Sequence, residues 1–415
     1  MMRISTGMER NNFSHYNRLH EIDKNKTEKQ INSSYRIGLL RDDPSSAAHS
    51  IRFQGKLARL AKYQQNAEQT INNYAVAEGT MDNAIQLMQR IREIAVQAAN
   101  GVWTPNDLNY MAQEVNTYLE EIFRLSNQTG ADGLSLFAGT RTEGTAFRAI
   151  RGNVDGADGL VITGVEYIGN NASRHAEYSE GARIDAQFPG NAVFWAENQK
   201  VWSANRVDGF VVPEDTYIVI DDTRIDLKAG DSIQSLIERI NQADVAVKAT
   251  LDPVENTLVL STTTPHQIWL SDGDGGSVLR DLGILSNLER QSPNNLDSAA
   301  RITGGSTFDM IVQLRDAMYE ADQHKIGGSA LGGIDMALES INVQRSKLGS
   351  QENRLSYALQ RLSQEENSYT AWDNVARALN FTDAIAELNA LETMLQASYR
   401  MTGSTIKTTL MDFLR

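Results

Sequence analysis

The sequence of 415 residues contains no cysteine, which excludes disulfide bonds, thiol catalysis and thiolate metal sites. The absence of cysteine also suits a protein that passes into an oxidising compartment. Proline is scarce, with seven residues in the chain and none after Pro293. Because proline is the residue that most strongly breaks a helix, long uninterrupted helices are allowed towards the C-terminus.

Long apolar stretches are missing as well. No apolar run reaches the roughly 18 residues of a membrane span, so no transmembrane helix is predicted. The segment from Met1 to Met8 leads into Glu9 and Arg10 without the apolar core of a secretory signal, so we expect the ordinary secretory route not to be used. The net charge of −14 disfavours binding to nucleic acid or to an anionic membrane.

The residue patterns of common enzymes and metal sites are also absent. Six histidines are scattered without an HExxH arrangement, and His15 and His20 lie five residues apart, which is not the spacing of ligands on one helix face. The acidic glycine runs Asp155–Gly159 and Asp272–Gly276 lack a glutamate at the distance of a calcium loop, so turns are predicted there. We expect no catalytic residue, no cofactor and no metal, and hence no enzymatic activity.

What the sequence does contain is helical patterning at both ends. Residues Ala47–Asn100 and Gly332–Arg415 carry apolar side chains at spacings of three and four, which predicts long helices that pair as an intramolecular coiled coil. Polar residues interrupt this seam in both segments, namely Gln64, Glu78, Arg345, Glu352 and Glu366. A helix start is predicted at Pro44, and Thr104 or Asn106 is predicted to cap the helix that follows.

The middle of the chain has strand and turn signals instead. Residues 216–220 and 223–227 alternate apolar and polar side chains around Asp221-Asp222, which predicts a hairpin. A short helix is predicted over Ser232–Gln242, followed by strands at 245–250, 257–261 and 267–270. The predicted order is two strands, a helix and three strands.

Together these patterns predict an α+β fold, in which both chain ends form a long antiparallel helical bundle or coiled coil around a β-rich inserted domain. We divide the chain into terminal helices (1–41 and 381–415), a helical bundle domain (42–146 and 301–380) and the inserted domain (147–300). The first 40 residues offer only a thin apolar face, so both termini are expected to be disordered until a partner covers them.

Leu388, Leu391 and Leu395 form one stripe on the last predicted helix. Ala47–Asn100 cannot extend far enough to cover this stripe, so we predict that the three leucines contact neighbouring subunits. The alternative, that the stripe is intramolecular core, is left open.

Several phrases resemble the bacterial flagellin family, and within it the proteins that join hook and filament. They are Met2–Thr6, Asp42–Ala47, Ile91–Gly101, Leu125–Thr140 and Asn380–Ile385. The ending of the fourth phrase, Leu136–Thr140, is similar to the joining proteins more than to filament flagellins. Arg41, in place of a small residue, and the additional Met1 depart from the family pattern.

The resemblance implies a structural subunit of the bacterial flagellum, exported by a flagellar type III system. Its implied partners are further copies of itself in a ring, another hook-associated protein on the hook side, flagellin or the next junction protein on the filament side, and a cytosolic export chaperone. The implied location is the flagellum, external or periplasmic. A filament-forming flagellin and a soluble coiled-coil scaffold or adhesin are the alternative functions.

Overall fold

The computed structural model describes residues 2–37, 43–130, 133–141, 143–286, 288 and 292–411, with side chains described from residue 14 to residue 401. The chain divides into two compact units. Unit 1 comprises Met1–Gln64 and Leu359–Arg415, and unit 2 comprises Gln65–Ala358. The finer division predicted from the sequence, with boundaries near residues 41, 146, 300 and 380, remains a prediction.

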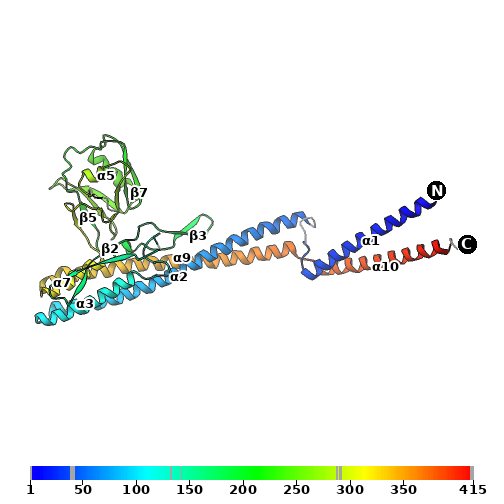
Figure 1. Ribbon diagram of the computed structural model, residues 1–415, viewed down its shortest axis with the longest axis horizontal. Coiled ribbons are helices and arrows are strands. Elements are labelled where there is room, and N and C mark those ends of the chain that lie inside the picture. Colours follow the sequence, from blue (N-terminus) through cyan, green and yellow to red (C-terminus); the bar gives the residue numbers. More distant parts are fainter. Residues whose placement is uncertain are drawn as a thin grey trace. The chain divides into compact units, whose positions relative to one another are not determined.

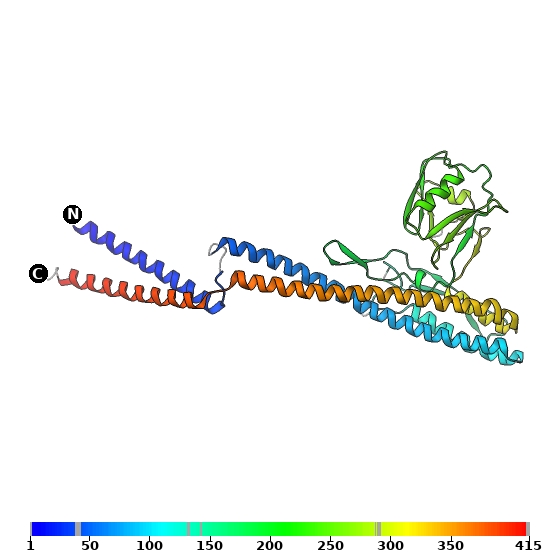
Figure 2. The same ribbon diagram turned by 180° about the vertical axis from the view of Figure 1, so that it is seen from behind.

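Unit 1 consists of helices from both ends of the chain. Helix α1 (Met2–Ser33) contacts α10 (Phe381–Met411), and the two lie side by side in Figure 1 and Figure 2. The structure therefore shows Met2–Ser33 and Phe381–Met411 as helices. The predicted disorder of both termini in the free monomer remains a prediction. The unit also contains the first part of α2 (Pro44–Asn100) and the last part of α9 (Leu331–Arg377).

The predicted start of α2 is confirmed. Pro44 is its first residue, where a missing N–H costs nothing. The carboxylate of Asp43 accepts hydrogen bonds from the backbone N–H groups of Ser45 and Ser46, both at 3.1 Å. These bonds satisfy donors that the helix itself leaves unpaired.

The seam between α2 and α9 is confirmed, and its polar interruptions pair with one another. Gln64 donates to Glu366 at 2.9 Å in unit 1. In unit 2, Arg345 reaches Glu78 at 3.3 Å and Asp82 at 2.7 Å. The apolar seam positions Leu60, Ala67, Tyr74, Met81, Ile85 and Met88 of α2 and Ile341, Leu348, Leu355 and Leu362 of α9 are buried. Because later residues of α2 meet earlier residues of α9, the helices are antiparallel, and a polar pair at a matched level favours one register.

The helical part of unit 2 adds four short elements to α2 and α9. They are α3 (Pro105–Ser126), α7 (Thr307–Tyr319), α8 (Gln323–Lys325) and a π-helical turn, η1 (Ile326–Ala330). Thr104 caps α3 in a capping box with Asp107, as one of the two predicted caps. Ser306 and Asp309 form the same arrangement at α7. Figure 1 shows α3 and α7 at one end of this helical layer, and the two helices contact each other.

Two β-hairpins lie next to these helices. The first pairs β1 (Phe147–Asn153) with β2 (Leu160–Tyr167), which contacts α3 and α7. The second pairs β3 (His175–Ser179) with β4 (Ala182–Asp185). The hydroxyl of Tyr74, on α2, lies within hydrogen-bond distance of the backbone oxygen of Asp185. This contact ties the second hairpin to the long helix.

The rest of unit 2 is an α+β module built on two antiparallel sheets. One has the order β10-β6-β7 and the other β11-β5-β9-β8. The strands are β5 (Lys200–Trp202), β6 (Thr216–Ile220), β7 (Thr223–Leu227), β8 (Val247–Leu251), β9 (Leu258–Thr262), β10 (Leu270–Asp272) and β11 (Arg301–Thr303). Helices α4 (Gly190–Val193), α5 (Ile233–Gln242) and α6 (Val278–Asp281) accompany them. The apolar residues of α5 and of both sheets share one core.

The predicted hairpin and the predicted element order are confirmed in this module. Ile220 pairs with Thr223, and Asp221 and Asp222 have φ values of 47° and 63°. Positive φ at both central residues is the geometry of the tight turn that matches strand twist. The last strand was predicted over 267–270 but spans Leu270–Asp272. That prediction is wrong because side chains, rather than a neighbouring strand, bind the backbone of Gln267 and Ile268.

Long helices at both ends and small antiparallel sheets between them confirm the predicted α+β fold.

Candidate assembly surfaces

The predicted leucine stripe lies on α10, and the structure gives it a cover within the same chain. Leu388 is half-buried, whereas Leu391 and Leu395 are 9% and 7% exposed. The contacts between α1 and α10 account for this burial. The predicted contact of these leucines with other subunits remains a prediction. The sequence argument concerned only the reach of Ala47–Asn100, and in this structure α1 is the helix that lies beside the stripe.

Polar contacts also link α1 to α10. Lys24 forms an ion pair with Glu392 at 3.0 Å, and Ser398 bonds to the side chain of Asn17. The hydrogen bond to Glu392 raises the pKa of Lys24. Sequence periodicity did not predict the pairing of α1 with α10, because α1 has few apolar residues. That α1 helps to bury the leucines of α10 is seen only when the two helices lie side by side.

The sides of α1 and α10 that do not face each other expose large apolar side chains. On α1 these are Tyr16, Leu19 and Ile22, and on α10 they are Phe381, Ile385, Met394, Tyr399 and Met401, each more than two-fifths exposed. By helical spacing, Phe381, Ile385 and Tyr399 share one side of α10, and Met394 and Met401 share another, so the exposed apolar residues lie on both flanks of the contact with α1. Exposed apolar residues on a pair of helices are typical of a surface that another protein covers. These flanks of the terminal helices are the candidate assembly surface.

The phrase Leu136–Thr140 lies in an irregular segment of unit 2 that ends in a turn at Gly139 and Thr140. Phe137 is fully buried and meets Phe194 edge to face, with ring centroids 5.4 Å apart. Gly139 has a φ of 65°, and a Cβ at this position would lie 2.2 Å from the backbone oxygen of Asn170. Glycine is therefore required at residue 139 by both backbone conformation and space.

The aromatic core around this turn joins segments that are distant in sequence. Phe308 of α7 stacks on Phe194, the residue that follows α4, at 5.7 Å and meets Phe147 of β1 at 5.3 Å. The hydroxyl of Tyr167 donates to the backbone oxygen of Phe137 at 2.9 Å. Burial raises the pKa of Tyr167 strongly, so this hydroxyl stays protonated. Together these contacts hold the turn, both strands of the first hairpin and α7 in one unit.

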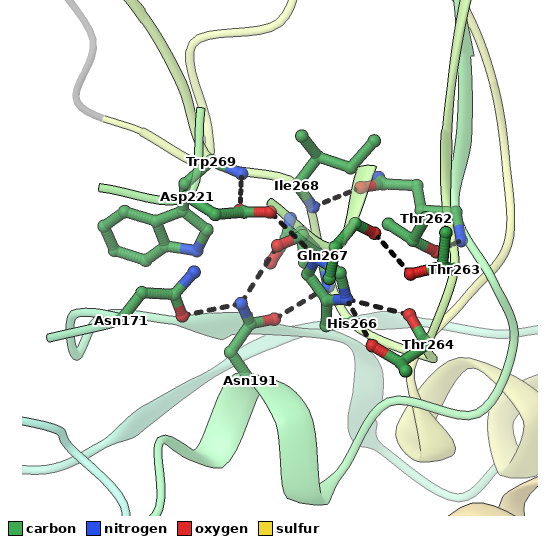
Figure 3. A network of polar contacts seen from close by, with 12 residues as sticks. Asn171, Asn191, Asp221, Thr262, Thr263, Thr264, His266, Gln267, Ile268 and Trp269 are labelled. Atoms are coloured by element: carbon green, nitrogen blue, oxygen red, sulfur yellow. Dashed lines mark hydrogen bonds and ion pairs between the residues drawn. The ribbon is translucent and has the colours of Figure 1, made fainter. Parts of the chain in front are cut away.

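A polar network surrounds the segment between β9 and β10 (Figure 3). Asn191 of α4 donates to Asn171 at 2.8 Å and to the backbone oxygen of Gln267 at 3.0 Å, and accepts from the backbone N–H of Gln267 at 3.0 Å. The side-chain oxygen of Gln199 accepts from the backbone N–H of Ile268 at 2.7 Å. These side chains replace the missing strand partner for an irregular segment.

His266 in this network has contacts that resemble part of a catalytic triad. Its Nε2 lies 2.9 Å from Asp221 Oδ2, and Thr264 Oγ1 lies 3.4 Å from Nδ1. However, Nδ1 is closer to the backbone oxygen of Thr264, at 2.8 Å. A ring nitrogen engaged with a carbonyl is not available to take a proton from a hydroxyl. The Oδ1 atom of Asp221 also accepts from the backbone N–H of Trp269 at 3.0 Å, so the geometry favours a structural role.

The two acidic glycine runs form turns whose carboxylates bind other parts of the chain. Asp272 accepts from the backbone N–H of Leu279 at 2.8 Å, and burial raises the pKa of its carboxyl. Asp158 accepts from Gln113 at 3.2 Å. Within the described residues, no group of three or more His, Asp or Glu side chains is arranged to hold a metal ion. Among the helices in that same part of the chain, none combines the length and the apolar character of a membrane span.

Comparison with known protein families gives matches for both ends of the chain and for part of its middle. The bacterial flagellin N-terminal helical region matches residues 4–142, the flagellin C-terminal helical region matches 331–414, and the flagellin hook IN motif matches 214–264. The last match covers the predicted hairpin, α5, β8 and β9.

Similar curated proteins include Flagellin A of Vibrio cholerae serotype O1, which is 25% identical over 382 residues, covering 90% of this chain and 88% of the relative. Polar flagellin C of Vibrio parahaemolyticus is 23% identical over 387 residues, with the same coverage. Among solved structures, hook-associated protein 3 of Legionella pneumophila aligns with a TM-score of 0.45 and 16% identity, covering 77% of this chain and 96% of the other. FlgL of Xanthomonas campestris aligns with a TM-score of 0.45 and 16% identity, covering 76% and 97%. Since the two terminal regions together match more than half of its residues, the chain belongs to the bacterial flagellin family.

Proposed function

We propose that this protein is a structural subunit of the bacterial flagellum that joins hook to filament. The observation that carries a role in assembly is the set of exposed apolar residues on the flanks of α1 and α10, which neighbouring subunits would cover. Long helices with many modest contacts suit a subunit that must bond to two different lattices, because no single anchor has to fit both. The role is structural and requires no catalysis.

The choice of the junction over the filament rests on the phrase Leu136–Thr140. Its sequence resembles that of junction proteins, and Phe137 and Gly139 are both held by specific packing within unit 2. A role as filament-forming flagellin is the second candidate, because similar curated proteins are named flagellins. Membership of the flagellin family counts against an unrelated coiled-coil scaffold or adhesin.

The partners in this proposal are further copies of the chain in a ring, another hook-associated protein on the hook side, and flagellin or the next junction protein on the filament side. A cytosolic chaperone would cover α10 before type III export, and the exported protein would reside in an external or periplasmic flagellum. Leu388, Leu391 and Leu395 would then have two uses. They would bind α1 within the monomer, and they would meet neighbouring subunits if α10 leaves α1 during assembly.

Immunogold labelling of isolated flagella separates the two candidates. We expect gold at a single position between hook and filament. Deletion of the gene should leave hooks in place, abolish filaments and release flagellin into the medium. Gold along the whole filament would favour the flagellin role, and absence of label from flagella would contradict both.

A further inference from the structure

The two units carry opposite net charges. Unit 1 contains 17 Lys and Arg against 13 Asp and Glu, whereas unit 2 contains 22 against 40, giving +4 and −18 within the total of −14. Such asymmetry between two parts of one chain favours contacts between unlike parts of different copies and disfavours contacts between like parts.

Part of the positive charge of unit 1 lies along one side of α2. Arg52, Lys56 and Arg59 are separated by four and three residues, so they share one helix face. No Asp or Glu occurs on α2 between Pro44 and Ala67, and like charges at these spacings destabilise a helix. Arg52 and Arg59 are exposed, and across the described ranges neither has a hydrogen-bond or ion-pair partner. Arg52 and Arg59 therefore leave two cations on this face of α2 that an acidic partner would neutralise.

An aromatic patch adjoins this row. His49 stacks on Phe53 with ring centroids 6.2 Å apart, and Phe53 meets Tyr369 and Trp372 of α9 at 6.1 and 6.0 Å. Trp372 is 52% exposed. His49 precedes Arg52 by three positions, so the rings continue the side of α2 that carries the cations.

The aromatic residues and the cations together define a basic-aromatic face (His49, Arg52, Phe53, Lys56, Arg59, Tyr369 and Trp372). Tryptophan, tyrosine and arginine are the residues that most often dominate the energy of a protein interface. The aliphatic stem of an arginine can also cover ring surface while its guanidinium pairs with a carboxylate.

We propose that the basic-aromatic face of unit 1 docks onto the acidic unit 2 of a second copy of this chain. This inference rests on the proposed role in assembly, which brings many copies of the chain together. Each unit 1, with its net charge of +4, then lies near a unit 2 of another copy, with its net charge of −18. A nucleic acid would also suit cations beside a tryptophan, but the net charge of −14 repels polyanions at long range. The acidic unit 2 of a second copy offers carboxylates to the cations of this face, and its net charge is opposite in sign to that of unit 1.

A photo-reactive benzoylphenylalanine in place of Trp372 tests the contact in flagella isolated after irradiation of living cells. We expect adducts of twice the chain mass, with the linked peptide lying within residues 65–358. Charge reversal by Arg59→Glu in the same chain should lower the adduct yield several-fold. The matched variant Lys248→Glu changes an exposed residue of β8 by the same charge and should not lower it. Both single variants should unfold at the temperature of the unaltered protein, because exposed charges without partners contribute little to stability.

Adducts to another protein or to nucleic acid, or a yield that Arg59→Glu leaves unchanged, would overturn the inference. Immunogold labelling of the same preparations separates a failure of the docking inference from a failure of the proposed function. If the protein is present in flagella but forms no adduct with residues 65–358 of a second copy, only the docking inference fails. If the protein is absent from flagella, the proposed function fails with it.

Discussion

Replacing Leu391 with alanine tests whether α10 is held by α1 in the monomer. Leu391 is 9% exposed on α10, so the change removes most of a buried side chain. Buried Leu→Ala substitutions cost about 2–5 kcal/mol, and the lower end applies to a helix pair open to solvent on both sides. A loss of about 2 kcal/mol raises the population of the open pair about 30-fold. Amide hydrogens of α1 between residues 14 and 33 should exchange faster by that factor.

Met394 provides the matched control three residues further along the same helix. It is 54% exposed, so Met394→Ala should leave exchange in α1 nearly unchanged. Met394→Asp should nevertheless reduce incorporation into flagella if the exposed side of α10 meets neighbouring subunits. Rapid exchange of α1 that Leu391→Ala does not alter would refute the reasoning. The termini would then be disordered in the monomer, as the sequence predicts, and the leucine stripe would be free for subunit contacts.

Three further changes test the interior and one helix cap. Phe308→Ala removes a fully buried ring that meets Phe147 and Phe194, so urea unfolding of unit 2 should show a loss of about 3–5 kcal/mol, and an unchanged midpoint would contradict this packing. Gly139→Ala should cost about 2 kcal/mol because its φ is 65° and the new Cβ would clash with Asn170; Gly133→Ala, at a φ of 75° with open space around it, should cost less, and equal costs would exclude the clash. Asp43→Ala should destabilise the start of α2 at neutral pH, because hydrogen bonds from Ser46 lower the pKa of Asp43. A lowered folded-state pKa gives stability that is present above the unfolded value, near 4, and is lost as pH falls through the folded value. The difference in thermal stability between the two proteins should therefore shrink in acid, and a difference that grows in acid would contradict the cap.

The sequence alone determined the elements whose signal is local. Apolar residues at spacings of three and four located α2 and α9, and Pro44 and Thr104 located two helix starts. Alternation around Asp221 and Asp222 located the hairpin, because a two-residue acidic turn fixes both the strand ends and the register. The polar residues noticed within the seam also proved to be partners, as Gln64 with Glu366 and Arg345 with Glu78.

Only the tertiary structure decided which faces meet. A periodic stripe reports that a helix has a buried side but not what covers it, so the sequence did not reveal that α1 lies beside Leu391 and Leu395. Strands β5 and β11 have three residues each, too few for alternation to be read, and they become strands because β9 supports β5, which in turn pairs with β11. The aromatic core joins Phe137, Phe147, Phe194 and Phe308 from four separate segments. Nothing local in these segments indicates that they converge, because the free energy that brings them together comes from burial of their rings against one another.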